Sequence, residues 1–227
     1  MARILAILTN RGTYEGHGER TGLWLGELTH FVEIAEAAGH AVELASPAGG
    51  AVPLDPRSLG WLFTTANDRA KQADPGFVRA LAETRALRDV DVDAFGAIYF
   101  TGGHGTMFDF PSCPDFAPAC ARIHARGGIV ASVCHGVGAM LALDTPETRA
   151  LVAGQVLTGY SDFEETLAGV RALVPFSLEE RLRGVGAIYE KALVPFTPYV
   201  RVSGRLVTGQ NPQSTRAVAR ATVGLLR

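Results

Sequence analysis

The sequence is poor in cysteine, and its cysteines lack the spacing that binds metals. Only Cys113, Cys120 and Cys134 occur among 227 residues, and no C-x-x-C pair is present. Structural zinc sites and disulfide-stapled domains need several cysteines at short spacings, so both are excluded. An odd number of cysteines is typical of free thiols in a reducing compartment. We therefore expect three free cysteines, no metal and a cytoplasmic location.

Long apolar runs and clusters of like charge are also missing. The most apolar segment, residues 128–143, is interrupted by Ser132 and His135, whereas a membrane-spanning helix needs roughly 18 apolar residues in succession. The first ten residues lack the apolar core and cleavage pattern of a signal peptide. Lys and Arg are scattered and the formal net charge is −2, which excludes the basic surface that nucleic acid or an anionic membrane requires.

What the sequence does contain is enough apolar material for one large core. Apolar residues make up 47% of the chain and charged residues 19%. A chain of 227 residues lies near the upper size that a single core can organise. No linker or low-complexity stretch divides it, so we expect a single domain over residues 1–227.

Apolar strand-like segments alternate with amphipathic helix-like segments along the chain. Strands are predicted at residues 3–9, 41–46, 96–103, 128–133 and 155–160, with a hairpin at 199–209. Helices are predicted at residues 22–40, 115–126, 177–184 and 213–226. One or two more are predicted in the polar region around Pro53, Pro56 and Pro75, including a helix that ends near Arg88. Asp115 is expected to cap the second of these helices, and Ser177 with Glu180 to form a capping box. This alternation predicts an α/β fold with a mainly parallel sheet covered on both faces.

Cys134 follows the predicted strand 128–133 directly. Ligands of open parallel sheets bind beyond the carboxyl ends of the strands. The pattern from Ser132 to Gly136, S-x-C-x-G, is a variant of the G-x-S-x-G nucleophile elbow, whose tight turn exposes the nucleophile and requires small neighbours. A helix beginning at His135 would point its N–H groups at the sulfur, so we expect a reactive thiolate. Lone cysteines are more often small buried apolar residues, which is our expectation for Cys113 and Cys120.

A second glycine-rich segment, YFTGGHGT at residues 99–106, also ends a predicted buried strand. In a doubly wound sheet its loop can lie beside Cys134. Glycines leave backbone N–H groups unobstructed, which suits an oxyanion hole formed by the amides of Gly103 and His135. A tight turn alone would explain paired glycines equally well.

Glu27 lies within the apolar stripe of the predicted helix 22–40, one turn from both Trp24 and Phe31. A carboxylate in such a place must be paired, exposed at a rim or protonated. Near a reactive thiol it would serve as a general acid and base, whereas a structural salt bridge is the alternative. His30 and Glu33 share a face with Glu27, but without a third ligand we expect no metal there.

Five segments together resemble one known family. TGLWLGELTHF, FTGGHGTMFDFP, VASVCHG, VLTGYSDFEE and LVTGQNPQS occur in the order and spacing of the ThiJ/PfpI superfamily, whose fold is that of class I glutamine amidotransferases. The similarity covers nearly the whole chain. It is closest to the branch of heat-inducible chaperones with glutathione-independent glyoxalase (glyoxalase III) activity. The resemblance implies a flavodoxin-like three-layer α/β/α sandwich, a homodimer and no cofactor.

The resemblance also implies roles for particular residues. Cys134 is the nucleophile, His135 its catalytic neighbour and Glu27 the acid and base. A third acidic residue, which orients the histidine, falls in DFEET; we align it with Glu165, while Glu164 and Asp162 stay open. No histidine precedes a glutamate in the H-x-E spacing of the amidotransferases, so glutamine hydrolysis is disfavoured.

The leading hypothesis is an enzyme that converts a small aldehyde, methylglyoxal, to lactate without glutathione. Deglycation, amide or peptide hydrolysis and nitrile-type hydration need the same nucleophile and oxyanion hole, so they stay open as alternatives. A stress chaperone or redox sensor without turnover is a second class, because an exposed low-pKa thiol oxidises readily. Flavin binding at LTNRGTYEGHG, residues 8–18, is disfavoured, because charged residues interrupt the loop and the elbow would be unexplained.

Overall fold

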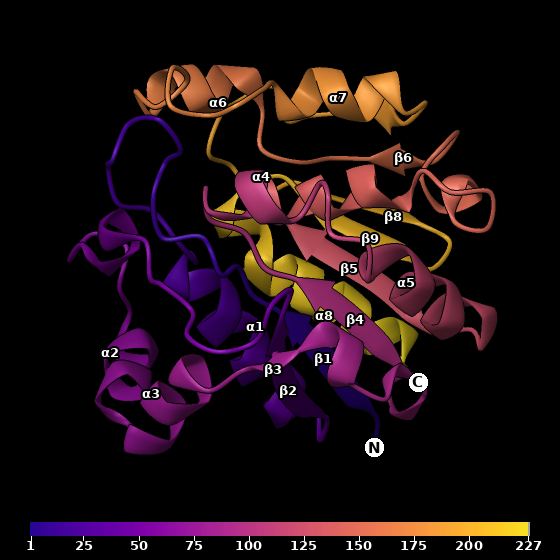
Figure 1. Cartoon of the computed structure of the whole chain (residues 1–227), viewed down its shortest axis with the longest axis horizontal. Helices are drawn as coiled ribbons and strands as arrows, with labels where there is room; N and C mark the ends of the chain where they lie inside the picture. The colour runs from indigo at the N-terminus through magenta and orange to yellow at the C-terminus, as the bar shows by residue number, and fades with distance from the viewer. Residues whose placement is uncertain (227) are drawn as a thin grey trace.

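The centre of the molecule is a seven-stranded β-sheet (Figure 1). The computed structural model describes residues 1–226, and the strand order of this sheet is β3-β2-β1-β4-β5-β9-β8. In that order the strands span Arg85–Ala86, Ala41–Ser46, Arg3–Ile7, Ala97–Phe100, Ile129–Val133, Leu206–Gly209 and Val200–Ser203. All neighbours run parallel except β8, which pairs antiparallel with β9. The mainly parallel sheet predicted from the sequence is confirmed.

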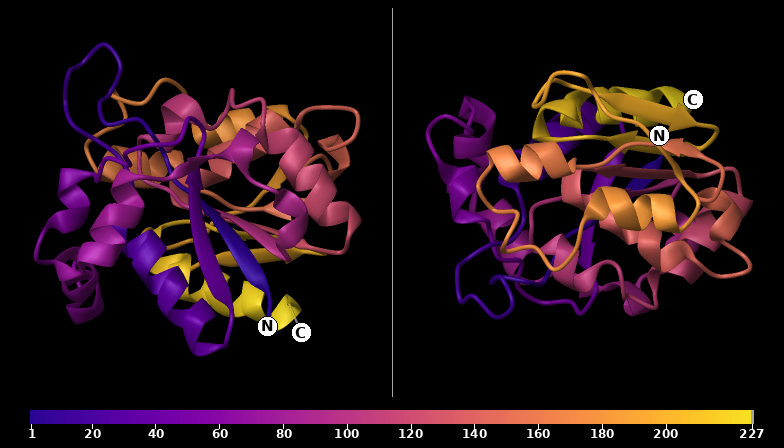
Figure 2. Two further views of the ribbon diagram at one scale, coloured as in Figure 1. Left: turned by 60° about the horizontal axis from the view of Figure 1, so that its bottom comes forward. Right: turned by 90° about the horizontal axis from the view of Figure 1, so that it is seen from above.

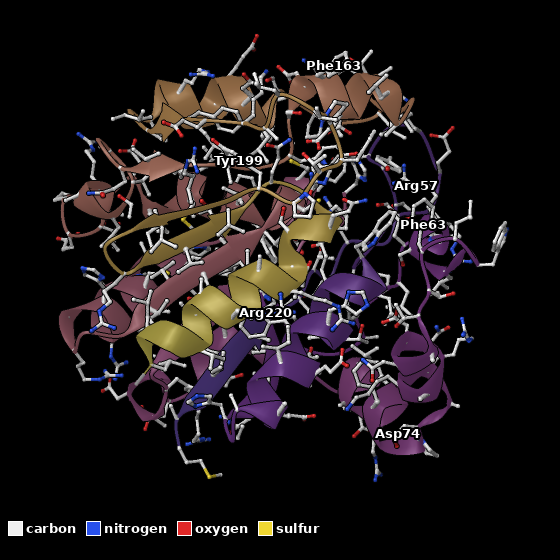
Figure 3. All side chains as sticks on the ribbon, turned by 180° about the vertical axis from the view of Figure 1, so that it is seen from behind. Arg57, Phe63, Asp74, Phe163, Tyr199 and Arg220 are labelled. Carbon is white, nitrogen blue, oxygen red and sulfur yellow. The ribbon has the colours of Figure 1, made fainter. Side chains whose placement is uncertain are left out.

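Helices cover both faces of the sheet, which completes the expected flavodoxin-like α/β/α sandwich (Figures 1 and 3). Helices α1 (Leu25–Ala37) and α8 (Thr215–Leu225) pack against each other on one face, and Figure 3 shows α8, with the labelled Arg220, crossing the sheet. The other face carries α5 (Phe116–Ala125) and the 3₁₀ segment Cys134–Leu143. Both layers exist because the central strands are apolar on both faces: all five residues of β5 are buried.

Shorter elements surround these layers. Helices α6 (Asp162–Leu167) and α7 (Leu178–Gly184) lie along the upper edge of the molecule in Figure 1, seen from above in Figure 2. Helices α2 (Ala66–Ala73) and α3 (Pro75–Ala82) lie at the opposite side, and α4 (Thr106–Asp109) follows β4. Short 3₁₀ turns span Pro56–Leu59, Leu87–Asp89, Val92–Ala94, Arg149–Leu151 and Pro212–Ser214. Among the described residues no helix combines the length and apolar character needed to cross a membrane.

The strand expected at residues 155–160 is largely wrong. Only Val156–Leu157 (β6) is a strand, and it pairs with β7 (Ile188–Tyr189) in a separate two-stranded sheet. The chain leaves strand geometry after Leu157 because it turns toward the elbow, where the Tyr160 N–H donates to the Cys134 carbonyl at 3.4 Å. This departure places Tyr160 and the start of α6 next to Cys134.

Two helix starts also differ from expectation. Helix α1 begins at Leu25 rather than residue 22, because the preceding residues are extended: the N–H of Leu23 bonds to Pro53 and that of Trp24 to Gly102. Asp115 forms no side-chain cap on α5. The Ser177 hydroxyl accepts the Glu180 N–H at 3.0 Å and so caps α7, but among the described residues the Glu180 side chain makes no return bond, so only half of the predicted capping box is present. The later start of α1 matters most, because the Trp24–Gly102 hydrogen bond joins the beginning of this helix to the loop after β4.

Candidate active site

Cys134 occupies the tip of β5 in a strained backbone conformation. Its φ of 57° lies in the left-handed region, which costs a non-glycine residue about 1–2 kcal/mol. The predicted tight turn is therefore present, with a 3₁₀ segment after it in place of an α-helix. A side chain at Gly136 would collide with the backbone of Thr101, so the turn needs glycine there because β4 and the elbow approach closely.

The ionisation of Cys134 differs from the expectation. Burial, followed by the adjacent Glu27 carboxyl, raises the pKa of the Cys134 thiol well above its usual value, although the His135 N–H acts in the opposite sense. The thiolate predicted from the helix dipole is thus wrong for the unliganded site. A short 3₁₀ segment offers less dipole than an α-helix, and a side chain only 2% exposed loses the solvation that stabilises a thiolate. Deprotonation must accompany the reaction instead of preceding it.

Glu27 lies in the first turn of α1 and is completely buried. Its Oε2 accepts the Gly102 N–H at 2.6 Å, while Oε1 has no hydrogen-bond partner among the described residues. Glu27 and Cys134 both lie against Gly102, so the two side chains are neighbours. Burial raises the pKa of Glu27 to about 8, against the lowering effect of Cys134 and the Gly102 amide. A Cβ on Gly102 would lie 2.5 Å from Oε2, so this close approach requires glycine. Among the residues that the structure describes no salt bridge reaches Glu27, and with a pKa of about 8 the carboxyl is mostly protonated at neutral pH.

His135 connects Cys134 with an acidic residue of α6. The Cys134 sulfur lies 3.3 Å from His135 Nδ1, and His135 Nε2 lies 2.8 Å from Glu165 Oε2. Burial opposes ionisation of Glu165, but the neighbouring His135 and His104 lower its pKa far below its ordinary value. Glu165 is therefore ionised and accepts a hydrogen bond from His135 Nε2–H, which leaves Nδ1 free to accept the thiol proton.

The two other acidic residues of DFEET do not reach His135. Glu164 accepts hydrogen bonds from Ser161, Gln210, Asn211 and the Phe196 N–H, so it ties neighbouring loops together. Asp162 accepts from the Ser177 hydroxyl at 2.6 Å. Of the three, the geometry places Glu165 against the histidine.

The sequence analysis did not identify His104. Its Nε2 lies 2.7 Å from Glu165 Oε1, and its Nδ1 lies 2.8 Å from Arg57 Nη2. Because an arginine only donates, His104 Nδ1 is the acceptor and Nε2–H donates to Glu165. Burial and the nearby His135 lower the pKa of His104 to about 4, so His104 stays neutral. The sequence shows this histidine within GGHGT, but its partner Glu165 lies 61 residues away, so the contact cannot be predicted from local sequence.

Arg57 is in turn held by Asp55. The Arg57 Nη2 lies 2.8 Å from Asp55 Oδ2 and also contacts the Tyr14 hydroxyl. The Arg57 side chain is 35% exposed and that of Asp55 is buried. The ion pair neutralises the guanidinium and orients it toward His104. Arg57 therefore donates in two directions, to Asp55 and to His104, and His104 in turn donates to Glu165.

The oxyanion hole expected from the amides of Gly103 and His135 stays a prediction. The Gly103 N–H has no acceptor among the residues that the structure describes, and the His135 N–H points at the Cys134 sulfur. A pocket of about 370 Å³ opens at this point, and its polar lining includes Arg57, His104, Cys134 and His135. A carbonyl compound bound there would meet the sulfur and the two histidines together.

Among the described residues one cluster brings three possible metal ligands together, and it is not the pair considered from sequence. His30 contacts Asp68 at 3.3 Å and Glu33 pairs with Arg216 at 2.7 Å, so the pair considered from sequence does not converge. His104, His135 and Glu165 have ligand atoms within 4.8 Å of one another. The hydrogen bonds described above account for that proximity.

Comparison with known proteins identifies the family. Residues 25–224 match the model of the DJ-1/PfpI family. The glutathione-independent glyoxalase HSP31 of Saccharomyces cerevisiae is 30% identical, covering 99% of this chain and 97% of its own. The structure resembles Rapid Encystment Protein 24 kDa of Francisella tularensis (TM-score 0.95, 32% identity, 100% of each chain) and glyoxalase III of Candida albicans (TM-score 0.90, 27% identity, 100% and 98% of the chains). The chain belongs to the DJ-1/PfpI family.

Proposed function

We propose that this protein is a glutathione-independent glyoxalase that converts methylglyoxal and water to lactate. The observation that carries the proposal is that two buried proton carriers, Glu27 and His135, lie beside one cysteine, and that this cysteine lines a pocket. Isomerising a 2-oxoaldehyde to a 2-hydroxyacid requires a nucleophile and a group that moves a proton between adjacent carbons. Relatives named as glyoxalases support the same reaction. The homodimer and the cytoplasmic location stay predictions.

The first step is addition of Cys134 to the aldehyde carbon. As the S–C bond forms, the thiol proton passes to His135 Nδ1, 3.3 Å away, and the ionised Glu165 stabilises the resulting imidazolium. The N–H groups of Gly103 and His135 hold the developing oxyanion. The imidazolium then returns the proton to that oxygen, which gives a hemithioacetal on Cys134.

The second step moves a proton between the two substrate carbons. In its ionised form, which is populated as the pH approaches its pKa of about 8, Glu27 takes the hydrogen of the former aldehyde carbon as a proton, which gives an enediolate. Glu27 returns this proton to the adjacent carbon while His135 carries the hydroxyl proton of the former aldehyde carbon to the neighbouring oxygen, which gives a thioester of the 2-hydroxyacid. A base is most effective when its pKa lies near the working pH, and burial places that of Glu27 at about 8. The group that receives the proton also returns it, so Glu27 ends unchanged.

The last step is hydrolysis of the thioester. His135 removes a proton from water as it adds to the carbonyl, and the N–H groups again hold the oxyanion. Collapse releases lactate, and the Cys134 sulfur recovers its proton from His135. Atoms balance, since methylglyoxal plus water equals lactic acid.

The proposed function is tested by turnover without any thiol. Purified protein is incubated with methylglyoxal in a buffer free of glutathione, and lactate is measured by chromatography against a heat-denatured sample. We expect lactate to form in proportion to protein concentration and its rate to be unaffected by added glutathione. Absence of lactate from a folded sample, or formation only when glutathione is supplied, contradicts the proposal.

Replacing His104 by phenylalanine is expected to lower kcat for methylglyoxal by about 10- to 100-fold. Phenylalanine keeps a ring beside His135, where the ring centroids are 3.9 Å apart, but it removes the donor that fixes Glu165. Steady-state kinetics measure the effect, with His17→Phe, at an exposed loop position, as the control. A kcat within twofold of the wild type would show that His104 does not position Glu165.

A further inference from the structure

The pocket is much larger than methylglyoxal needs. Its volume of about 370 Å³ would hold about a dozen water molecules and falls in the range typical of drug-sized ligands. Methylglyoxal has only a methyl group beyond its two carbonyls, so it would leave most of this space unfilled. A larger substituent on the same dicarbonyl would remove more apolar surface from water.

The part of the pocket beyond Cys134 is aromatic. Four rings line it, those of Trp24, Phe63, Tyr160 and Phe196. Trp24 and Phe63 pack edge to face, with ring centroids 5.3 Å apart, and form a common wall. Phe63 and Phe196 are 47% and 37% exposed, which is a large exposure for phenylalanine beside a cavity. A bound ring would cover both.

Phe196 is held at the pocket at an energetic cost. Among the described residues only Cys134 and Phe196 are non-glycine residues with positive φ, and that of Phe196 is 59°. Its N–H donates to the buried Glu164 Oε1 at 2.8 Å, and Asn211 donates to the same oxygen. Such strain persists where the surroundings enforce it and concentrates at functional sites. Glu164 therefore fixes an aromatic side chain at the pocket.

The charges of the pocket favour neutral substituents. Arg57 is the one Lys or Arg side chain in the lining, and its partner Asp55 neutralises it at 2.8 Å. A phosphate or carboxylate on the substrate would therefore lack a free cation and would face aromatic rings. An aromatic substituent needs no cation and packs favourably against aromatic rings.

We propose that the preferred substrates are 2-oxoaldehydes with an aromatic or bulky apolar substituent, arylglyoxals, and that Phe196 is a specificity-determining residue. This inference rests on the proposed function and names its substrate class. The dicarbonyl end reaches Cys134 while the ring packs among Trp24, Phe63 and Phe196. The reaction balances as before: phenylglyoxal plus water gives mandelate.

The test compares kcat/KM for phenylglyoxal and methylglyoxal. For the wild type we expect a preference for phenylglyoxal of about tenfold or more, since apolar pockets discriminate between substituents to this extent. In Phe196→Gly, whose glycine accepts the positive φ, the ratio of the two values falls by about tenfold or more. The two aldehydes differ in intrinsic reactivity and hydration, but these differences are the same for both proteins. They therefore cancel when the ratio of the two kcat/KM values in the wild type is compared with the ratio in Phe196→Gly. Leu193→Gly, a fully exposed position of the same loop, is the matched control and keeps the wild-type ratio.

A binding measurement separates this inference from the proposed function. In Cys134→Ala, quenching of Trp fluorescence by mandelate and lactate reports product binding without turnover, and we expect tighter binding of mandelate. Turnover of methylglyoxal with no preference for phenylglyoxal overturns the substrate class and leaves the glyoxalase function standing. Turnover of neither aldehyde, with mandelate still preferred, overturns the function but supports an aromatic ligand. Equal binding of the two acids overturns the inference.

Discussion

Replacing Cys134 by alanine is expected to lower kcat/KM for methylglyoxal by about 10⁴-fold or more, the scale of loss when a nucleophile is removed from a catalytic group. Neither of the other cysteines, Cys113 and Cys120, lines the pocket, so neither can replace it. Without the sulfur no hemithioacetal forms, so neither Glu27 nor His135 has a covalent intermediate to act on. Lactate formation under thiol-free conditions measures the loss.

The matched control for this variant is Cys113→Ala. Cys113 is also a buried free thiol, 6% exposed, but it does not line the pocket. We expect its replacement to change kcat/KM by less than about twofold. Lactate production by folded Cys134→Ala at the wild-type rate would rule out the covalent mechanism and leave the chaperone or another chemistry in its place.

The elements that the sequence predicts well are those whose pattern is local. Strand β5 and the turn at Cys134 follow from a short apolar run and small neighbours, and both are confirmed. Glu27 stands out because a carboxylate interrupts an apolar stripe, and burial of that position is confirmed. The strand at residues 155–160 fails because hydrogen bonds to the elbow, absent from any local pattern, redirect the chain.

The features that the sequence does not predict are those that depend on distant partners. The pKa of Cys134 is set by burial and by Glu27, which is 107 positions away in the chain, counted from the two residue numbers. A helix dipole next to the cysteine predicts a lowered thiol pKa, which is opposite to the direction found, because burial and Glu27 do not appear in the local sequence. The link between His104 and Glu165 likewise joins two loops that neighbour each other only after the sheet forms. Choosing Glu165 over Glu164 needed the same information.

Glu27 and Cys134 form one coupled group. The pKa of each is raised by burial, so the first proton lost on raising the pH leaves a single proton for the two side chains to share. After that loss one of the two side chains, Glu27 or Cys134, is negatively charged and the other keeps its proton. The proposed addition and proton transfer require one charged and one protonated group. Wild-type kcat/KM is therefore expected to rise with pH up to about 8.

Replacing Glu27 by glutamine is expected to lower kcat/KM by about 10²- to 10⁴-fold, the usual contribution of a general acid and base, and to stabilise the fold at alkaline pH. Glutamine is neutral, as the protonated carboxyl is; its oxygen can accept the Gly102 N–H and its NH₂ group replaces the unpartnered Oε1. The rise of activity toward pH 8 should disappear in this variant. Glu36→Gln, an exposed position of the same helix, serves as the control for both effects.

The direction of the stability effect follows from the raised pKa. Between its ordinary value of 4.5 and the folded value of about 8, the unfolded chain releases the Glu27 proton and the folded protein retains it. The contribution of Glu27 to the stability of the wild type is therefore most favourable below pH 4.5 and falls as the pH rises to about 8, by about 3–5 kcal/mol in total. The glutamine variant lacks this loss, so its free energy of unfolding should match the wild type near pH 4 and exceed it by that amount at pH 8. Urea unfolding at both pH values measures the difference. An equal difference at the two would mean that Glu27 is already ionised in the folded protein, and the proton transfers assigned to it would then need another residue.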